Sequence, residues 1–482
     1  MSGFTEQLAF KLGVVRHFAR VRWGARYRDV AALRKAQLAG LRRQVRFWEE
    51  NSPYIAEHLR VTQSGCGAAS DIESLAGSGA KLGSRGSAVP AFIVENSAQD
   101  AALRELVETL PVMDKPTMMD HFNELNTAGL DRDTALEVAI RSEKDRDFSA
   151  DMDGISVGLS SGTSGHRGLF VVSKAERAEW AGTILALALP KGKILGHKIA
   201  LFLRAGNQLY DSIGSRAVHF EYFDIYKPLT ENLAALNALQ PTILVAPPSV
   251  LRDIAAAQEA GTISVAPQKI FTAAEVLEPI DERYFKRVFK HDIIHQIYQC
   301  TEGLLGVTCQ YGTMHLNEDA AIFEKQYVDS HRFIPIVTDY RRTTQPIVRY
   351  RLGDILVEKQ GKCLCGNPAT AIDRIEGRSG DTLELTDADD YSATIYADMV
   401  SRAMLYADGV EEYRIVQREP GAIDVYLRPQ SGVARLVCED SVHTELTVLL
   451  NRFNLGQLTI NYHTYTRDTS AKMRRVERAF LS

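Results

Sequence analysis

Between residues 198 and 312, apolar runs of strand length alternate with longer segments of helical periodicity. This alternation constrains the fold, because strands separated by a helix lie parallel rather than pairing through a tight turn. The clearest runs are residues 199–203, 243–246 and 269–271. We expect Pro247-Pro248-Ser249 to mark a strand end and a turn, and a helix to start with Val250-Leu251-Arg252 behind the capping hydroxyl of Ser249. Ligands of such sheets bind beyond the carboxyl ends of the strands, so functional residues are expected there.

A loop rich in glycine and hydroxyl residues, residues 160–168, lies between two apolar runs, residues 155–159 and 169–172. Its glycines let backbone N–H groups approach phosphate oxygens, its hydroxyls add donors, and Arg167 offsets negative charge. A surface linker is the alternative, but linkers do not normally lie between strands of this kind. The loop lacks the Gly-Lys-Ser/Thr ending of a Walker loop. It predicts a nucleotide triphosphate site formed by Ser160, Ser161, Gly162, Thr163, Ser164 and Gly165.

Size and composition limit the class of protein. A chain of 482 residues exceeds what one hydrophobic core usually supports, so at least two domains are expected. The net charge of -5 argues against nucleic acid as the main partner. No apolar run is long enough to span a bilayer, and the N-terminus has no apolar signal core, so a cytoplasmic location is expected. The sequence is compatible with a homodimer without specifying one.

Further motifs follow the loop in a fixed order. They are Ala273-Ala274-Glu275, Tyr298-Gln299-Cys300-Thr301-Glu302, Tyr350-Arg351-Leu352-Gly353-Asp354, Gly377-Arg378 with Asp381, and Lys472 with Arg474 and Arg475. Each motif alone is weak, but the ordered set resembles the adenylate-forming superfamily of acyl- and aryl-CoA ligases. Within it, the set is similar to the phenylacetate-CoA ligase-like branch and its deazaflavin-cofactor synthetase-related proteins.

The resemblance implies an α/β fold with two main parts. One is a large N-terminal adenylate-forming domain with mixed, largely parallel sheets flanked by helices, and the other is a small mobile α+β C-terminal domain. Residues 1–90 are expected to form a helical segment and a mobile connection packed on the core. Residues 91–378 would form the ATP- and acyl-binding core, and residues 379–482 the domain that carries the catalytic lysine. The first helix is expected to have a basic face that is solvated, with contact to an anionic membrane or an acidic carrier protein as the alternative; its residues are Arg16, Arg20, Arg22, Arg26 and Arg28.

The implied activity is ATP-dependent activation of a carboxylic acid to an acyl-adenylate with release of pyrophosphate. The acyl group would then pass to a thiol, either CoA or the arm of an acyl carrier protein. Two alternatives stay open: an amine or cofactor hydroxyl as the acceptor, and a nucleotide-binding homologue that no longer turns over. ATP and Mg2+ are the implied cofactors, since a phosphate-centred reaction between two anions needs positive charge.

The resemblance also assigns roles to single residues. Tyr298 would stack on or flank adenine, Thr301 would contact the α-phosphate, and Glu302 would help to hold Mg2+. For Glu302 the alternative is a structural carboxylate at a helix N-terminus. Lys472 would bridge the substrate carboxylate and the α-phosphate, and the alternative is a solvated lysine of the C-terminal tail.

Four further residues are implied to hold the nucleotide. Ala274 and Glu275 would line the adenine, and Asp354 would accept hydrogen bonds from the ribose hydroxyls. Asp354 as a turn former is the alternative. Arg378 would contact a phosphate or the ribose near the domain junction.

The chain departs from the family pattern at that junction. Gly380 stands where relatives carry the first acid, which leaves Asp381 as the candidate hinge. The glycine-rich turn that normally follows is missing from residues 383–395, where Asp387, Asp389 and Asp390 cluster. Because this region lines the thiol-access tunnel in CoA ligases, adenylation is better supported than transfer to CoA.

A second constellation has the chemistry of a metal site. Cys309, His315, Cys363 and Cys365 offer the four sulfur and nitrogen ligands of a closed structural zinc site, with Cys-x-Cys-Gly as the tight turn. Cys300 is a competitor for the place of His315, and ordinary buried thiols are the alternative to a metal site.

The acyl pocket is the least specified part. By resemblance it borders on Arg204, Asn207, Tyr210, His219 and Tyr222. These side chains indicate an aryl acid with a polar substituent, although core packing accounts for the aromatic residues equally well.

Overall fold

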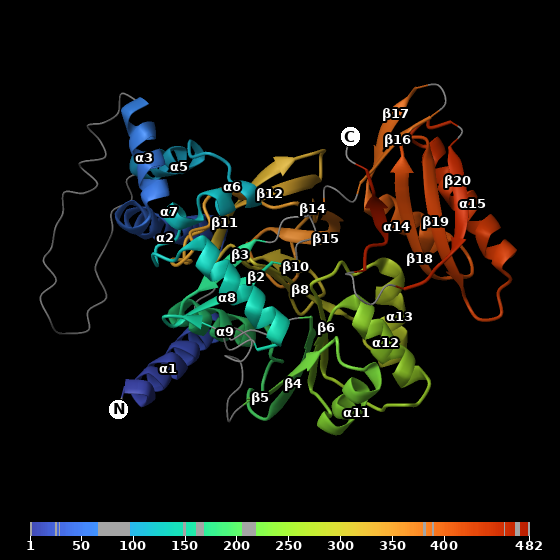
Figure 1. Ribbon diagram of the computed structural model, residues 1–482, viewed down its shortest axis with the longest axis horizontal. Coiled ribbons are helices and arrows are strands. Elements are labelled where there is room, and N and C mark those ends of the chain that lie inside the picture. The colour runs from blue at the N-terminus through green and yellow to red at the C-terminus, as the bar shows by residue number, and fades with distance from the viewer. Residues whose placement is uncertain are drawn as a thin grey trace, which may run out of the picture.

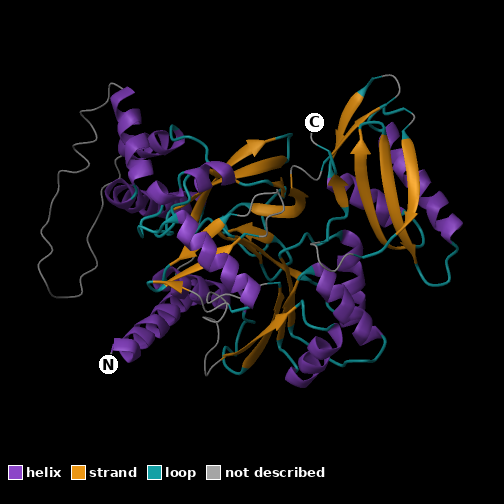
Figure 2. Ribbon diagram, in the orientation of Figure 1, coloured by secondary structure: helices purple, strands orange, loops and turns teal. Residues whose placement is uncertain are grey.

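The computed structural model describes most of the chain. The described residues are 2–24, 27, 29–65, 97–147, 151–160, 168–204, 218–378, 382–387, 390–456, 458–467 and 473–480. Helices lie on the outside of two bodies of β-structure, one large and one small (Figure 2).

The helices are α1 Ser2–Trp23, α2 Val30–Asn51, α3 Pro53–Gly65, α5 Ser97–Glu108, α6 Lys115–Asp120, α7 Phe122–Leu125, α8 Arg132–Asp145, α9 Lys174–Ala188, α11 Leu229–Leu239, α12 Pro248–Glu259, α13 Pro279–Phe289, α14 Ala397–Tyr406 and α15 Arg435–Asn451. The strands up to the end of the large sheet are β1 Asp151–Met152, β2 Ile155–Leu159, β3 Leu169–Val172, β4 His197–Leu203, β5 Val218–Asp224, β6 Ile243–Ala246, β7 Lys269–Ala273, β8 His295–Cys300, β9 Gly303–Thr308, β10 Met314–Leu316, β11 Ala321–Tyr327, β12 Arg332–Asp339, β13 Tyr350–Arg351, β14 Asp354–Glu358 and β15 Ala371–Arg378. The remaining strands are β16 Leu383–Thr386, β17 Ser392–Ile395, β18 Val410–Glu419, β19 Ala422–Pro429, β20 Thr459–Thr464 and β21 Val476–Arg478.

One long sheet organises the large body. Its order is β11-β12-β14-β15-β10-β9-β8-β7-β6-β4-β5, and β13 pairs with β12. The strands β5, β4, β6, β7 and β8 are mutually parallel, and the helices between them cross over the sheet. From β8 to β11 each neighbouring pair is antiparallel. The predicted α/β class and the predicted parallel strands are confirmed, and the antiparallel part completes a mixed sheet.

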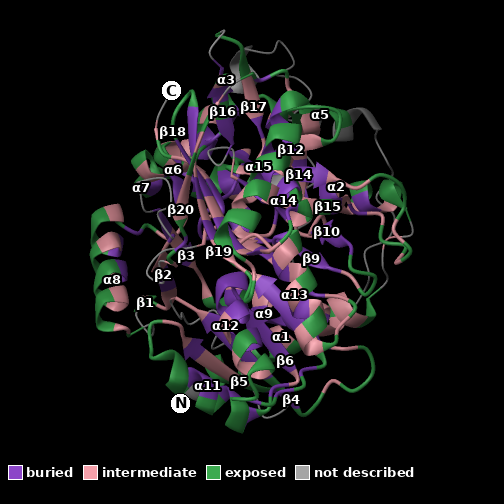
Figure 3. Cartoon of the chain, turned by 90° about the vertical axis from the view of Figure 1, so that its right-hand side faces the viewer, coloured by how far each residue is buried: buried purple, intermediate pink, exposed green. Residues whose placement is uncertain are grey.

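A small sheet carries the two ends of the glycine-rich loop. It has the order β1-β2-β3, and β2 pairs with β3 in antiparallel register from Ser156 opposite Val172 to Leu159 opposite Leu169. The two strands expected on either side of the loop are therefore confirmed. Helix α8 packs on this sheet through Ala135 and Ala139, and its other face is largely exposed (Figure 3).

The residues from 382 to 480, called the C-terminal region below, lie beside α12 and α13 (Figure 1). A four-stranded sheet of order β20-β19-β18-β21, the helices α14 and α15, and the hairpin β16-β17 compose it. It buries a core of its own, which includes Tyr413, Val425 and Leu446, and Ile280 of α13 packs against this core. The last strand, β21, pairs parallel with β18, so the end of the chain is built into this sheet.

The N-terminal helix α1 packs along α9, where Gly182 allows the close approach. A Cβ on Gly182 would lie 2.5 Å from the backbone oxygen of Val14. Arginines of the predicted basic face are partly used inside the protein: Arg22 donates to the carbonyls of Ala186 and Leu189 at the end of α9. Such pairing satisfies carbonyls that a helix C-terminus leaves open. Within the described residues, no helix is both long and apolar enough to cross a membrane.

Candidate active site

The turn between β8 and β9 carries Thr301 and Glu302. Gly303 has φ +148°, which lets β8 reverse directly into β9. The carboxylate of Glu302 is buried and accepts a hydrogen bond from the hydroxyl of Thr301 at 3.0 Å. The hydroxyl of Tyr350 also pairs with it, and burial followed by the charge of Glu302 raises the pKa of Tyr350 well above its ordinary value. Glu302 therefore stands in a hairpin turn, and the alternative of a helix N-terminus is wrong.

A buried arginine that sequence reasoning missed ties this turn to the small sheet. Arg342 donates to the carbonyl of Thr301 at 2.6 Å and to the carbonyl of Val171 in β3 at 3.2 Å. Asp339 accepts the backbone N–H groups of Arg341 and Arg342. Burial raises the pKa of Asp339 to about 6, although these N–H groups act in the opposite direction. Arg342 thus connects the turn that carries Thr301 and Glu302 to β3, the strand that follows the glycine-rich loop.

Tyr298 and Asp354 meet at the carboxyl end of the parallel strands. The hydroxyl of Tyr298 donates to Oδ2 of Asp354 at 2.6 Å, and the ring of Tyr298 belongs to the core. Burial and the neighbouring carboxylate raise the pKa of Tyr298 well above its ordinary value, so this hydroxyl stays a donor. Asp354 begins β14 and lies opposite Arg378, the last residue of β15. The structure brings these three predicted site residues together.

The turn after β7 holds a buried carboxylate that joins three segments. Ala274 has φ +67°, a conformation that is unfavourable for alanine and that accumulates at functional sites. The carboxylate of Glu275, 2% exposed, accepts the backbone N–H of Ser249 at 3.1 Å and of Met473 at 3.2 Å. It also lies 3.6 Å from Nη2 of Arg204.

This arrangement corrects one prediction. Helix α12 begins at Pro248 with Pro247 as its N-cap residue, so Ser249 lies inside the first turn and its hydroxyl is not the expected cap. The N–H of Ser249 points instead to Glu275, whose negative charge suits the positive end of a helix. A cap that comes from another segment leaves no local signal in the sequence.

The base of the glycine-rich loop is closed by Ser160. Its backbone N–H donates to the carbonyl of Gly168 at 2.7 Å, and its hydroxyl accepts the N–H of Gly168 at 2.7 Å. Nζ of Lys115 lies 3.3 Å from the same hydroxyl, so a cation stands at the base of the loop, a role that the sequence did not assign to this lysine. The predicted residues Ser161, Gly162, Thr163, Ser164 and Gly165 lie outside the described residues, as do Asp381 and Lys472.

The four predicted metal ligands converge. The ligand atoms of Cys309, His315, Cys363 and Cys365 all lie within 4.8 Å of one another. The two sulfurs of Cys309 and Cys363 are 3.8 Å apart, and Sγ of Cys365 is 3.2 Å from Nε2 of His315. Tetrahedral zinc with bonds of ~2.3 Å sets two sulfur ligands ~3.8 Å apart. His315 points its other nitrogen at the carbonyl of Ala369, which orients the ring as in metal sites (3.1 Å).

Cys300, the competitor for the place of His315, is not part of this cluster. Its sulfur lies 4.0 Å from Oδ2 of Asp354. The pKa of Cys365 is raised to about 11. Burial is the largest cause, and the neighbouring thiols of Cys363 and Cys309 act in the same direction. Three thiols and an imidazole that lie this close together are the donor set of a tetrahedral zinc site, so the cluster fits a metal ion.

Comparison with solved structures identifies the fold. A crystal structure of 2-hydroxyisobutyryl-CoA ligase in the postadenylation state, in complex with 2-HIB-AMP, has a TM-score of 0.67 to this chain. The similarity covers 94% of this chain and 91% of that one at 14% identity. The chain has the fold of an acyl-CoA ligase. At this identity the similarity concerns the fold alone.

Two other structures of that ligase differ in conformation. The TM-score is 0.56 for an open conformation and 0.52 for the thioesterification state, at the same 94% coverage of this chain. Since the protein compared is the same, the difference reflects how its parts are arranged. Of these three structures, the one in the postadenylation state has the highest TM-score to this chain.

Sequence comparison gives a more limited result. No protein-family model matches the chain. A segment of 197 residues is 27% identical to Protein CapK of Staphylococcus aureus. This segment covers 40% of the chain and 43% of CapK, so the match spans less than half of that relative.

Within the acyl-CoA ligase fold, the residues predicted for the acyl pocket separate. Arg204 reaches Glu275, and the hydroxyl of Tyr222 donates to the carbonyl of Leu203 at 3.0 Å. His219 has a side chain that is 62% exposed beside Glu221 on β5, the edge strand. Asn207 and Tyr210 lie outside the described residues.

Proposed function

We propose that this protein activates a carboxylic acid with ATP, forming an acyl-adenylate and releasing pyrophosphate, and then transfers the acyl group to a thiol. The observation that carries the proposal is the double contact of Glu275 with Ser249 and Met473. It brings the residue that follows Lys472 to the strand edge where nucleotides bind in sheets of this kind. The shared fold with an acyl-CoA ligase gives further support.

The residues at the strand edge suit a nucleotide. The carboxylate of Asp354, oriented by Tyr298, would accept hydrogen bonds from the ribose hydroxyls. Arg378 on the opposite strand would neutralise a phosphate or contact the ribose. Ala274 and Glu275 would border the base, and the loop from Ser160 to Gly165 would contact the phosphates.

Glu302 has the surroundings of a cation ligand. Its buried carboxylate is oriented by two hydroxyl groups, of Thr301 and Tyr350, and no ion pair is recorded for it among the described side chains. We propose that Glu302 holds Mg2+ and that Thr301 contacts the α-phosphate. When bound, Mg2+ would stabilise the negative charge of the leaving pyrophosphate.

Lys472 would supply the charge that joins the two anionic substrates. Adenylation brings a carboxylate oxygen onto the α-phosphorus, where negative charge accumulates in the transition state. A compact ammonium on a flexible stem suits this position. In this proposal residues 91–378 form the nucleotide- and acyl-binding core, and residues 379–482 form the domain that delivers the lysine.

The acid is proposed to be an acyl or aryl acid, and the acceptor to be CoA or a carrier-protein thiol. The similar 2-hydroxyisobutyryl-CoA ligase was solved in complex with 2-HIB-AMP and with CoA. For this chain the adenylation step has the stronger support, because Tyr298, Asp354 and Arg378, which are described and are proposed to hold the nucleotide, lie together.

The cluster of Cys309, His315, Cys363 and Cys365 is proposed to hold a structural zinc ion. Its ligands come from the ends of β9 and β10 and from the turn before β15, and four protein ligands leave no position for a substrate. The ion would fix the loop between β14 and β15, next to the strand that ends at Arg378.

The decisive experiment is ATP–pyrophosphate exchange over a panel of aliphatic and aromatic carboxylic acids, with Mg2+ and without thiol. Exchange with one class of acid would establish adenylation and identify the substrate class. Product analysis with CoA, carrier protein or amines would then identify the acceptor. Absence of exchange over the whole panel, in protein that binds ATP, would contradict the proposal.

A further inference from the structure

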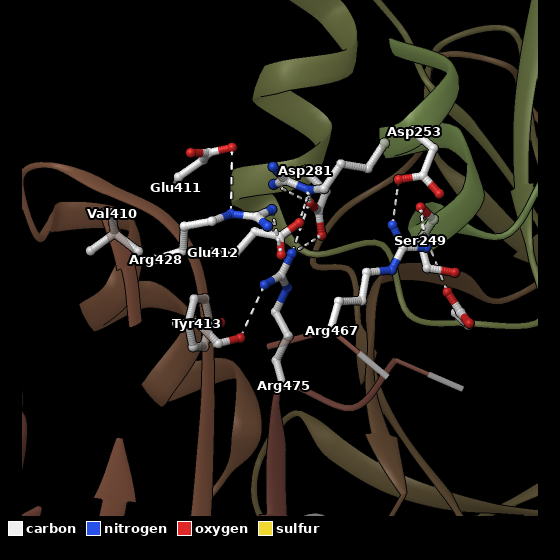
Figure 4. A network of polar contacts seen from close by, with 12 residues as sticks. Ser249, Asp253, Asp281, Val410, Glu411, Glu412, Tyr413, Arg428, Arg467 and Arg475 are labelled. Atoms are coloured by element: carbon white, nitrogen blue, oxygen red, sulfur yellow. Dashed lines mark hydrogen bonds and ion pairs between the residues drawn. The ribbon is translucent and has the colours of Figure 1, made fainter. Parts of the chain in front are cut away.

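The segment after Lys472 is fastened to the large body by a buried ion pair. Arg475 donates to both carboxylate oxygens of Asp281 on α13, each at 2.9 Å (Figure 4). The Asp281 side chain is 0% exposed and that of Arg475 is 2% exposed. Two charged groups are thus removed from water at the contact between the C-terminal region and α13.

A second arginine completes the contact from the large body. Arg252 of α12 donates to Oδ1 of Asp281 through Nε at 2.9 Å and through Nη2 at 2.5 Å. Nε of Arg252 also lies 3.3 Å from Glu412 of β18, which in turn lies 2.7 Å from Nη2 of Arg428 in β19. Positive and negative groups therefore alternate across the boundary between α12, α13 and the C-terminal region, as Figure 4 shows.

The network keeps Asp281 ionised. Burial by itself would raise the pKa of Asp281, but the guanidinium groups of Arg475 and Arg252 outweigh it and hold this pKa below its ordinary value. If the two bodies separated, the pairs Arg475–Asp281 and Arg252–Glu412 would be lost, and each charge would keep a partner only within its own body.

Arg475 also forms hydrogen bonds within the sheet of the C-terminal region. Its Nη1 donates to the carbonyl of Tyr413 at 3.1 Å, and its carbonyl accepts the N–H of Ile415 at 2.7 Å. One residue therefore joins β18 to α13. Two positions earlier, the N–H of Met473 donates to Glu275. Both attachments hold the backbone that directly follows Lys472, and three residues reach no more than ~11 Å.

Stability alone does not account for such a cluster. Apolar residues of similar volume often replace buried ion pairs without loss of stability. Directional contacts to two carboxylate oxygens do, however, specify one orientation. The 2-hydroxyisobutyryl-CoA ligase structures show that this fold takes up more than one arrangement, with TM-scores to this chain from 0.67 to 0.52.

We propose that Arg475, Asp281 and Arg252 form a latch that positions Lys472 for adenylation and that is released for acyl transfer. The latch residues are positioning residues, since they act through Lys472 rather than on the substrates. The kinetic effect of the latch rests on the proposed function. The contact itself can be tested by a structural measurement that does not depend on that function.

The kinetic test compares the two half-reactions in Asp281→Asn, Arg475→Gln and the conservative variant Arg475→Lys. Adenylation is measured by ATP–pyrophosphate exchange, and transfer by thioester formation from preformed acyl-adenylate and CoA. We expect exchange to fall about 100-fold in Asp281→Asn and Arg475→Gln, less in Arg475→Lys, while transfer changes by less than about threefold. Equal losses in both half-reactions, or unchanged exchange in folded variants, would overturn the latch.

Arg414→Gln is the matched control. Arg414 pairs with Glu477 at 2.6 Å inside the C-terminal region, between β18 and β21, so its loss removes an arginine without touching the boundary. We expect both half-reactions of this variant to equal those of the wild type. Thermal unfolding checks that each variant folds. If Arg475→Gln does not fold, the comparison rests on Asp281→Asn and Arg475→Lys.

The structural readout is amide hydrogen exchange in the unmodified protein and in Asp281→Asn. The N–H of Met473 crosses the boundary to Glu275, whereas the N–H of Ile415 stays within the C-terminal region. We expect faster exchange at Met473 and unchanged exchange at Ile415. Unchanged exchange at Met473 would refute the latch. If the wild type activates no acid, the proposed function fails, and this readout still decides on the latch.

Discussion

The carboxylate of Glu275 accepts a hydrogen bond from the backbone N–H of Met473 at 3.2 Å, across 198 residues of sequence. Glu275 belongs to the turn after β7, and Met473 directly follows Lys472. The contact therefore joins the strand edge of the large body to the segment that carries the proposed catalytic lysine.

From this contact we predict that Lys472→Ala abolishes adenylate formation. Loss of the cation at the α-phosphate should lower ATP–pyrophosphate exchange by at least about 100-fold, because charge stabilisation in the transition state is the main contribution of such a group. ATP binding, measured by calorimetry, should change little. The exposed Lys227 provides a control, and Lys227→Ala should exchange at the wild-type rate. Normal exchange in Lys472→Ala would remove this residue from the mechanism.

Tyr298→Phe tests the orientation of Asp354. The variant keeps the ring in the core and loses the hydroxyl that donates to the carboxylate at 2.6 Å. Removing this donor from the half-buried carboxylate should raise the KM for ATP roughly 10-fold, with a smaller effect on kcat. Tyr327→Phe is the control, since Tyr327 donates to Glu358 at the same 2.6 Å in an exposed place. A KM that stays the same in Tyr298→Phe would contradict a nucleotide-binding role for Asp354.

The cysteine and histidine cluster predicts one zinc ion per chain. Atomic emission should find this stoichiometry in protein purified without chelator, and Cys363→Ser and His315→Ala should lose the metal, because each removes one ligand of four. Cys300→Ser should keep it, since its sulfur lies beside Asp354 instead. If Cys300→Ser loses the metal and His315→Ala keeps it, Cys300 rather than His315 is the fourth ligand. Metal-free wild-type protein with intact thiols would refute the site.

His295 predicts a loss of stability in mild acid. Burial, and then the charges of Lys269 and His291, lower the pKa of His295 to about 4 from its ordinary value of 6.5. Between these values the unfolded chain binds the proton and the folded chain does not, so stability falls as the pH falls through this window. The shift corresponds to about 3 kcal/mol in the free energy of unfolding.

Urea unfolding of the wild type and of His295→Gln at pH values from 7 to 4 measures this contribution. As the pH falls, the unfolding free energy of the wild type should fall more steeply than that of His295→Gln, so the variant should gain stability relative to the wild type. His443→Gln, at an exposed position, should follow the wild-type curve. Parallel curves for the wild type and His295→Gln would show that His295 titrates alike in the folded and unfolded chains.

Local patterns in the sequence were sufficient to predict several elements. The strands on either side of the glycine-rich loop were predicted because each is a short apolar run bounded by glycine and serine. The parallel strands β4, β6 and β7 were predicted for the same reason, since fully buried strands are continuously apolar. The Cys-x-Cys turn was equally visible, because its two thiols are neighbours in the chain.

Predictions were incomplete where a residue's hydrogen-bond or ion-pair partner lies far away in the sequence. The helix after β6 was predicted, but it begins at Pro248 rather than after Ser249, and the expected cap was wrong, because the N–H of Ser249 donates to Glu275 from the turn after the next strand. Arg342 was missed, since nothing near it in the sequence indicates that its partners are Thr301 and Val171. Asp281 was missed likewise, because its partners come from α12 and from the end of the chain.

Apolar periodicity and residues close in the chain were enough to predict the strands on either side of the glycine-rich loop, the parallel strands β4, β6 and β7, and the motifs that indicate nucleotide chemistry. Tertiary structure alone decided that Tyr298, Asp354 and Arg378 meet, that His315 rather than Cys300 joins the thiols, and that Arg475 reaches Asp281. The physical reason is that burial selects partners by position in space: a buried charge or polar group must be paired, whatever the distance along the chain.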